Sequence, residues 1–183
     1  MPHYKGNSEP VRANTALLTR GFDPKLSVGS ARPAVFRSST YVFSSPEAAE
    51  RAFAIATGKV TPEPEEKSEL IYSRISHPNA EILEDQIVPI EAGASEAAVF
   101  NSGMAAIVTA FLTFCRPGDS VVYTEPVYGG TQHLLQDLLT RLGIQPTPVL
   151  AGDTAGLEAA IGAAERLRVV FIETPANPTM VMT

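Results

Sequence analysis

The chain lacks the cysteines that a disulfide framework or a zinc site would need. Cys115 is the only cysteine among its 183 residues, so an intrachain disulfide and a multi-cysteine metal site are both excluded. Residues 1–11 also lack the apolar run of a signal peptide. Both absences favour a cytoplasmic location.

Basic residues are in the minority as well. The 14 lysines and arginines against 20 aspartates and glutamates give a formal net charge of -6. An acidic chain repels the phosphate backbone of nucleic acids, so we expect no nucleic-acid partner. The length is sufficient for one domain with a buried core, or for one domain with an arm.

Charge is absent from residues 97–115, a stretch nearly long enough to cross a membrane. Asn101-Ser102-Gly103 interrupts this stretch, and a strand pattern precedes the break. A short buried strand over residues 97–100 and a buried helix over residues 103–115 account for the same residues. We therefore expect no membrane partner.

Helical periodicity is weak in residues 1–44, which contain several prolines. The apolar residues Leu17, Phe22 and Phe36 favour an irregular arm that packs on another surface over a disordered one. Residues 33–36 and 40–43 are compatible with extended backbone.

Two helices are predicted before residue 97. Ser45 followed by Pro46 indicates the start of the first helix, which is expected to end near Gly58. Residues 60–68 are rich in proline and glutamate and are expected to form an exposed loop. Pro78 opens the second helix, whose apolar face is formed by Ile82, Leu83, Ile87 and Ile90.

From residue 97 onward the pattern alternates between strands and helices. Strands are predicted over residues 97–100, 120–123, 147–150 and 168–173, and helices over residues 103–115, 131–142 and 155–166. The second of these helices has one face formed by Leu134, Leu135, Leu138, Leu139 and Leu142. Such alternation is typical of an α/β fold with a parallel sheet, in which ligands bind at the carboxyl ends of the strands.

Ser102-Gly103-Met104 lies at the junction of a predicted strand and a predicted helix. The free N–H groups at a helix start attract an anion, and a glycine lets a phosphate approach the backbone. A Ser-Gly helix cap without a ligand is the alternative. The chain has neither G-x-x-x-x-G-K-[ST] nor G-x-G-x-x-G, which disfavours a dinucleotide-binding oxidoreductase.

Three further segments carry candidate ligand groups. Tyr72 and Arg74 offer a hydroxyl and a guanidinium to a phosphate, although a surface arginine beside a half-buried tyrosine is the simpler explanation of this motif taken alone. Tyr128 follows a strand and precedes two glycines, so its ring is either presented to a ligand or packed in a turn. Asn177 lies between two prolines after the last predicted strand and offers an amide to a ligand, or forms an Asn-Pro turn.

Each of these motifs is weak alone, but their order and spacing are specific. Together they resemble the Cys/Met-metabolism family of pyridoxal-phosphate (PLP) enzymes, which includes cystathionine γ-synthase, cystathionine γ-lyase and methionine γ-lyase. The resemblance extends from about Thr19 to the end of the chain. It is carried by Tyr72-Ser73-Arg74-Ile75-Ser76-His77-Pro78, Ser102-Gly103-Met104-Ala105-Ala106-Ile107, Arg116-Pro117-Gly118-Asp119, Val127-Tyr128-Gly129-Gly130-Thr131 and Glu173-Thr174-Pro175-Ala176-Asn177-Pro178-Thr179.

The resemblance implies that pyridoxal 5'-phosphate is the cofactor. Its phosphate would be held by the backbone of Gly103 and Met104 and by Ser102. Tyr72 and Arg74 would reach the phosphate of the neighbouring subunit, so that the active site is shared across a dimer.

Two residues are implied to act near the cofactor ring. Tyr128 would stack on the pyridine ring and assist proton transfer near the substrate, which makes it the candidate catalytic residue. Asn177 would lie by the 3-hydroxyl oxygen, and Glu173 would support the end of its strand.

The implied fold is that of a fold-type-I PLP transferase, with a parallel-rich sheet flanked by helices. Residues 1–60 would form an arm and first helix that pack between subunits of a homotetramer, a dimer of dimers. Residues 61–183 would form the first part of the large PLP-binding domain, incomplete at its C-terminus.

The sequence departs from the family pattern in two ways. His77 stands where the family usually has Asn, and we interpret it as a helix cap before Pro78. The family's Schiff-base lysine and the aspartate that pairs with the pyridine nitrogen come after the point where this chain stops. The lysines present lie in no matching motif; they are Lys5, Lys25, Lys59 and Lys67.

We therefore expect the amino-terminal portion of an enzyme of trans-sulfuration, inactive by itself. The implied reactions are γ-elimination or γ-replacement on methionine, cystathionine or O-acylhomoserine-type substrates. The alternative is a truncated, catalytically inactive α/β module that binds a phosphate ligand or another protein.

Overall fold

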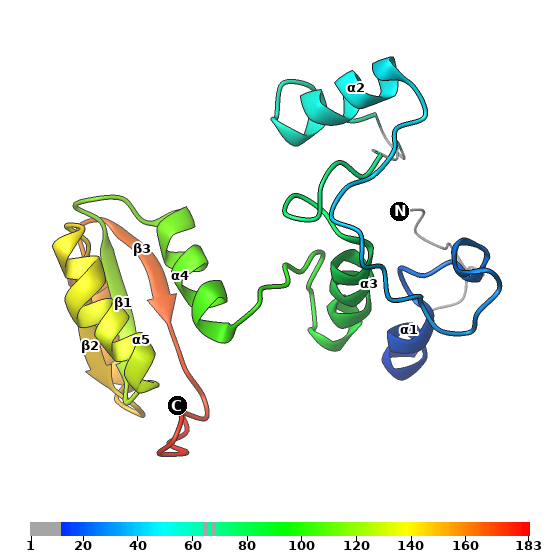
Figure 1. Cartoon of the computed structure of the whole chain (residues 1–183). Helices are drawn as coiled ribbons and strands as arrows, with labels where there is room; N and C mark the ends of the chain where they lie inside the picture. The colour runs from blue at the N-terminus through cyan, green and yellow to red at the C-terminus, as the bar shows by residue number, and fades with distance from the viewer. Residues whose placement is uncertain (1–11, 64–65, 67–68) are drawn as a thin grey trace. The chain divides into compact units, whose positions relative to one another are not determined.

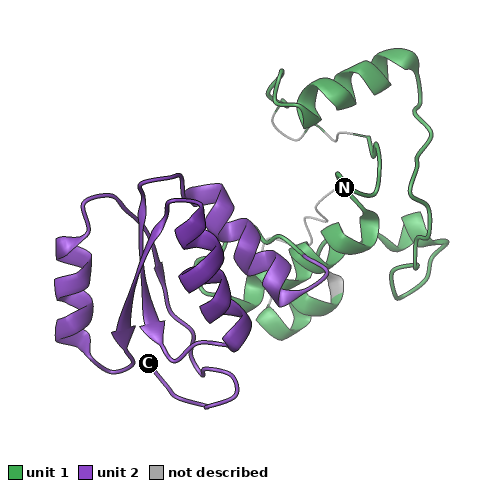
Figure 2. Ribbon diagram, turned by 60° about the vertical axis from the view of Figure 1, so that its left-hand side comes forward, with its two compact units in different colours: residues 1–99 green, residues 100–183 purple. Residues whose placement is uncertain are grey.

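A computed structural model describes residues 12–63, 66 and 69–183 of the chain. The chain forms two compact units, residues 1–99 and residues 100–183, which Figure 2 distinguishes by colour. The predicted absence of a signal peptide at residues 1–11, and part of the predicted loop over residues 60–68, fall outside the described residues.

The first unit consists of short helices joined by irregular segments (Figure 1). The α-helices are α1 (Ala13–Thr19), α2 (Pro46–Ala56) and α3 (Pro78–Ile87), and two 3-10 helices are η1 (Pro24–Ser27) and η2 (Val88–Ile90). The prediction that residues 1–44 lack helix was wrong at α1. This helix is short and has no side-chain cap, and its contacts with α3 and η2 stabilise it where local periodicity is weak.

Helix α2 begins as its sequence predicts. The Ser45 hydroxyl accepts a hydrogen bond from the Ala48 N–H group at 3.1 Å, and Pro46 occupies the first helical position. The chain leaves the helix just before Gly58, whose φ of 70° lies in the left-handed region. Both predicted boundaries are confirmed to within two residues.

Helix α3 confirms the interpretation of His77 as a cap. The His77 Nδ1 atom accepts a hydrogen bond from the Asn79 N–H group at 3.2 Å. The Asn79 side chain in turn binds the preceding arm, because its Oδ1 accepts from the Phe36 N–H group at 2.9 Å and its Nδ2 donates to the Ala34 carbonyl at 2.7 Å. One asparagine therefore ties an irregular segment to the start of a helix.

The second unit is a three-stranded parallel sheet with helices on both faces. Its strands are β1 (Ser120–Glu125), β2 (Gln145–Leu150) and β3 (Leu167–Phe171), in the order β2-β1-β3. Its helices are α4 (Gly103–Phe114), α5 (Gly129–His133), which continues into the π-helical segment η3 (Leu134–Leu139), and α6 (Thr154–Ala163). Figure 2 shows that helices cover both sides of the sheet. The predicted α/β fold and parallel pairing are confirmed.

The core of this unit lies between the sheet and the α4 and α5 face. Val121 and Tyr123 of β1 are completely buried against Leu135 and Leu139 of η3 and Phe111 of α4. On the opposite face Val122 is also completely buried. Because β1 is the central strand and both its faces are covered, the consecutive residues Val121, Val122 and Tyr123 are all apolar instead of alternating with polar ones.

The turn at residues 116–119 leads into β1 and buries a carboxylate. The Asp119 side chain is only 1% exposed, and its Oδ2 accepts from the Arg116 N–H group at 2.7 Å. The Arg166 Nη2 atom lies 2.9 Å from Oδ1, and the Arg168 Nε atom lies 3.6 Å from Oδ2. The predicted turn is confirmed, and it connects the starts of β1 and β3.

The strand predicted over residues 97–100 does not form. Val99 and Phe100 are 38% and 40% exposed, and no strand in the described parts of the chain pairs with this segment. The Val99 N–H group instead donates to the Glu84 side chain at 2.8 Å. An apolar run has strand pattern, but a strand forms only where a neighbour accepts its backbone hydrogen bonds.

Two predicted buried faces are only partly buried. In α4 Phe111 is buried, whereas Leu112 and Phe114 are 45% and 63% exposed, so the expectation of a helix buried all round was wrong. In the next helix Leu138 and Leu142 are about two-fifths exposed. A π segment has more residues per turn than an α-helix, and this rotates the later leucines out of the face that an α-helical period predicts.

Candidate functional site

The start of α4 presents two unpaired N–H groups. The Ser102 hydroxyl accepts from the Ala105 N–H group at 3.1 Å, which satisfies one of the first-turn donors. In the described part of the chain, no acceptor is bonded to the N–H groups of Gly103 and Met104. With the positive end of the helix dipole, these donors form a site for an anion.

Space is available at this helix start. A methyl group built on Gly103 would meet no atom of the described residues within 4 Å, and the same is true of Gly129 at the start of α5. A ligand phosphate can therefore approach the Gly103 backbone closely. The donor set and the open backbone fit the phosphate end of a cofactor such as pyridoxal 5'-phosphate.

The Tyr128 ring lies beside this helix start. Tyr128 is the N-cap residue of α5 and is 42% exposed. A Cβ atom on Gly130 would lie 2.7 Å from the Tyr128 Cε1 atom and 3.1 Å from the Met104 sulfur. The Tyr128 ring and the Met104 side chain therefore both lie against the Gly130 backbone, where a Cβ atom would displace them. This shared contact joins the starts of α4 and α5.

The segment after β3 is held to the segment after β1 by Glu173. One carboxylate oxygen, Oε1, accepts from the Tyr128 N–H group at 2.8 Å and from the Asn177 N–H group at 3.1 Å. Ala176 is buried, and its N–H group donates to the Val181 carbonyl at 2.9 Å. The Asn177 residue remains exposed.

Tyr72 and Arg74 lie in the first unit, on a turn that follows a single antiparallel bridge between Tyr72 and Thr40. The Ser73 N–H group donates to the Ser39 carbonyl at 3.0 Å and fixes the start of the turn. The Arg74 guanidinium carbon lies 5.7 Å from the centre of the Tyr72 ring, and both residues are exposed. The two side chains therefore form a pair that is accessible to a ligand.

The seven predicted site residues are thus divided between the two units. The second unit brings together Ser102, Gly103, Met104, Tyr128 and Asn177 at the carboxyl ends of β1 and β3. The first unit brings together Tyr72 and Arg74.

Two residues near the site, Gly130 and Gln136, were not predicted from the sequence. Gly130 supports the Tyr128 ring, and the paired glycines after Tyr128 were the signal for it. Gln136 donates from Nε2 to the Tyr123 hydroxyl at 3.1 Å and to Glu125 Oε1 at 3.2 Å, below the same strand end. Burial raises the pKa of Tyr123, so its phenol stays protonated as a donor to Glu125. A lone glutamine on a helix carries no sequence signal of such a network.

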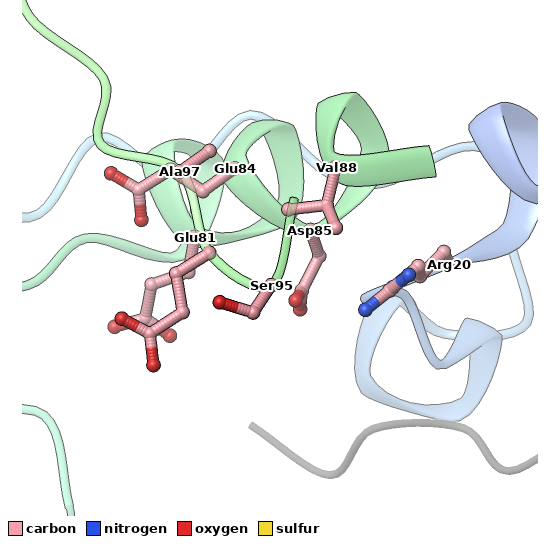
Figure 3. A pocket seen from close by; sticks show the side chains of 8 residues that line it. Arg20, Glu81, Glu84, Asp85, Val88, Ser95 and Ala97 are labelled. Atoms are coloured by element: carbon pink, nitrogen blue, oxygen red, sulfur yellow. The ribbon is translucent and has the colours of Figure 1, made fainter. Parts of the chain in front are cut away.

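A cavity of about 480 Å³ occurs elsewhere, within the first unit (Figure 3). Carboxylates dominate its lining, which contains one arginine, Arg20; the acidic residues are Glu81, Glu84, Asp85 and Glu96. Burial raises the pKa of Glu81. No residues of the chain that the structure describes form a cluster able to bind a metal ion, and the cavity contains none of the predicted site residues.

No helix within the described residues combines the length and the apolar character needed to cross a bilayer. A parallel α/β unit with an anion site and an exposed aromatic ring at its strand ends belongs to the class of cofactor-binding α/β proteins. Solved structures of similar fold define this class more closely. The chain superposes on an enzyme from Campylobacter jejuni, assigned as an O-acetylhomoserine (thiol)-lyase, with a TM-score of 0.79 and 26% identity. The alignment covers 95% of this chain and 40% of that one, whose structure contains N'-pyridoxyl-lysine-5'-monophosphate.

The family model for Cys/Met metabolism PLP-dependent enzymes matches residues 14–183, and the chain belongs to this family of fold-type-I enzymes. Similar curated proteins include an L-methionine gamma-lyase from Pseudomonas deceptionensis, 35% identical over 91% of this chain. A cystathionine gamma-synthase from Mycobacterium bovis is 40% identical over 60% of the chain. The matched part spans 39% and 27% of these two relatives, so the chain corresponds to an amino-terminal part of them.

Proposed function

We propose that this chain forms the phosphate-binding and ring-stacking part of a PLP-dependent enzyme of sulfur amino-acid metabolism. The observation that carries the proposal is the pair of unpaired N–H groups at the start of α4 beside the exposed ring of Tyr128. Family membership adds the identity of the cofactor, pyridoxal 5'-phosphate.

The residues of the second unit have separate roles in this proposal. The N–H groups of Gly103 and Met104 and the Ser102 hydroxyl bind the cofactor phosphate, and the helix dipole stabilises its charge. The Tyr128 ring covers one face of the pyridine and excludes water from it. The Tyr128 hydroxyl moves a proton at the substrate, and the Asn177 amide orients the cofactor through its 3-hydroxyl oxygen. When bound, pyridoxal 5'-phosphate supplies an electron sink for the carbon next to the substrate amine.

The residues of the first unit are proposed to act across a subunit interface. The exposed pair of Tyr72 and Arg74 binds the cofactor phosphate of a neighbouring subunit, since a guanidinium and a phenol match phosphate oxygens. Residues 1–60 pack between subunits of a homotetramer, and residues 61–183 form the first part of the large cofactor domain. The exposed apolar side chains Val35 and Val42 support a role in packing between chains.

The substrate is proposed to be a small amino acid, with γ-elimination or γ-replacement on methionine, cystathionine or O-acylhomoserine-type compounds. A covalent link to the cofactor requires a lysine, and none of the four lysines lies in a motif that matches the family. We therefore propose that the chain by itself is inactive. The single buried thiol of Cys115 is compatible with a cytoplasmic location.

The sharpest test removes one donor from the anion site. Gly103→Pro deletes the first N–H group of α4, and proline suits this helix position because Ser102 is already extended, with φ of -158° and ψ of 155°. Pyridoxal 5'-phosphate binding, followed by 31P NMR, is expected to weaken by roughly tenfold because a charge-assisted hydrogen bond is lost. Pyridoxal, which has no phosphate, is the control ligand and its affinity is expected to stay unchanged.

Equal binding of the cofactor to the wild type and to Gly103→Pro would contradict the assignment of the phosphate site. Borohydride treatment of the mixture tests the proposed inactivity, because it fixes any lysine-linked cofactor. An adduct at one defined lysine would show that the chain holds its own attachment site.

The alternative is a non-catalytic α/β module that binds a phosphate ligand or another protein. It is favoured by the absence of a lysine in a family motif. The coding sequence after Thr183 separates the two possibilities. A continuation into a lysine preceded by small hydroxyl residues supports the enzyme, and a stop codon supports the module.

A further inference from the structure

The two segments that carry Tyr128 and Asn177 follow different strands, β1 and β3. Tyr128 and Asn177 themselves have no direct hydrogen bond to each other among the described residues. Both are bonded instead to Glu173, which comes two residues after the end of β3. Beyond the pairing of β1 with β3, one side chain therefore connects the backbone at Tyr128 to the backbone at Asn177.

The geometry of these bonds is specific. The same oxygen atom, Glu173 Oε1, accepts from the Tyr128 N–H group at 2.8 Å and from the Asn177 N–H group at 3.1 Å. Hydrogen bonds to an ionised carboxylate are about twice as strong as those between neutral groups. Because the acceptor is shared, a displacement of the carboxylate moves both backbone segments.

We infer that Glu173 is a positioning residue that holds Tyr128 and Asn177 in the relative position in which both reach the cofactor. The inference rests on the proposed function, since the two residues are proposed to contact the ring and its 3-hydroxyl oxygen. Glu173 acts through backbone N–H groups and leaves the Tyr128 hydroxyl and the Asn177 amide available for the ligand.

The packing of Tyr128 explains why such a bond is required. Its ring lies against Gly130, and a Cβ atom built on that glycine would be 2.7 Å from the ring. This contact limits how closely the ring can approach the start of α5. This contact involves the ring and does not by itself fix the Tyr128 backbone. The bond from its N–H group to Glu173 fixes this remaining freedom.

Hydrogen exchange in the cofactor-free chain tests the shared bond directly. Glu173→Ala is expected to accelerate exchange of the Tyr128 and Asn177 amides together, by on the order of tenfold each. Glu173→Gln keeps an oxygen that can accept from both groups, and is expected to retain most of the protection. Glu158→Ala, which removes an exposed glutamate of α6, is the matched control and leaves both amides unchanged.

The amide of Ala151, bonded to the Glu125 carbonyl at 2.8 Å, reports on the same edge of the sheet without contacting Glu173. Its exchange is expected to stay constant in all variants. Acceleration at only one of the two amides, or equal acceleration at Ala151, would overturn the inference.

A second measurement connects the bond to the cofactor. Glu173→Ala is expected to weaken pyridoxal 5'-phosphate binding by roughly tenfold, with substantial rescue in Glu173→Gln. Equal affinities in the wild type and Glu173→Ala would overturn the positioning role. If the wild type binds no cofactor, the proposed function fails, and the exchange data alone still decide whether the two segments share one acceptor.

Discussion

The two units of this chain are stabilised in different ways. In the second unit nine buried residues form one continuous core cluster. They come from α4 and its C-cap, β1, the Val127 loop, the helix after that loop, and Ile144. In the first unit the buried apolar residues are dispersed; they are Phe22, Ala52, Ile71, Ile82 and Val88. Continuous apolar burial is the dominant source of folding free energy, so the second unit has the larger internal driving force.

The first unit depends more on polar contacts along the chain. Ser45 caps α2, His77 caps α3, and Asn79 bonds to the backbone of residues 34 and 36. Each such bond contributes about 1 kcal/mol. The segments proposed to bind the cofactor therefore lie on a packed sheet, whereas the Tyr72 and Arg74 turn is held mainly by local hydrogen bonds.

The largest effect is expected from the core of the second unit. Leu135→Ala removes a completely buried side chain and is expected to lower the free energy of unfolding by about 2–5 kcal/mol. Leu138→Ala, on the same π segment but 42% exposed, is the matched control, with an expected loss below about 1.5 kcal/mol. Urea denaturation followed by circular dichroism measures both. Equal losses of unfolding free energy in the two variants would contradict the expectation that the buried leucine contributes more to stability.

A smaller effect is expected at the buried carboxylate of the second unit. Burial alone would raise the pKa of Asp119, but the Arg116 N–H group and the Arg166 and Arg168 guanidiniums lower it below the ordinary value of 3.8. The ionised Asp119 carboxylate therefore contributes its full stabilisation above pH 3.8, and this contribution is lost as the pH falls through the lower folded-state pKa. Asp119→Asn is expected to reduce stability at neutral pH and to converge with the wild type in acid.

Acid titration of the unfolding midpoint measures the Asp119 effect. Asp137→Asn is its control, because Asp137 pairs with Arg141 on an exposed helix surface, where an ion pair contributes little. A difference between wild type and Asp119→Asn that stays constant over the whole acid titration would contradict the assigned role of the charge.

The two serine caps allow a direct comparison of the units. Ser102→Ala and Ser45→Ala each remove a bond of 3.1 Å to the N–H group of the third helical residue, and each is expected to cost about 1 kcal/mol. Exchange of the Ala105 and Ala48 amides reports the two losses. Only Ser102→Ala is also expected to weaken cofactor binding, and an equal effect of Ser45→Ala on binding would argue against the site.

The smallest effect is expected at a surface ion pair of the first unit. The Arg51 side chain, through bonds of 2.7 and 2.8 Å, lowers the pKa of Glu66 from 4.5 to about 2. Its contribution is present above pH 4.5 and is lost between pH 4.5 and about 2. Glu66→Gln is expected to accelerate exchange of the Glu63 amide, which bonds to Glu66 at 2.7 Å, without a measurable change in global unfolding. Glu50→Gln, on the exposed surface of α2, is the control.

Local chemistry made much of the fold predictable. The Ser45 and His77 positions were predicted from capping rules, and the parallel sheet followed from alternating strands and helices. The strand over residues 97–100 and the buried faces of α4 were not predictable in this way. Whether such apolar segments pair or pack depends on neighbours that local sequence does not specify.

The candidate site was predictable only in part for a similar reason. Ser102, Gly103 and Met104 follow from the helix start at Ser102, although the strand predicted before it does not form, and Tyr128 follows from its glycines. The shared acceptor on Glu173 joins positions 45 residues apart in the chain and depends on the β1–β3 pairing. No spacing rule in a single sequence encodes a bond of that range.

The π-helical segment Leu134–Leu139 also has a consequence for comparing sequences. A π turn accommodates one more residue than an α turn between the same two anchoring points. A relative with a regular α-helix here should therefore be one residue shorter between β1 and β2. An alignment that places no gap within this helix would pair Leu138 with a core position of such a relative, and would misassign every residue between the misplaced gap and the next strand.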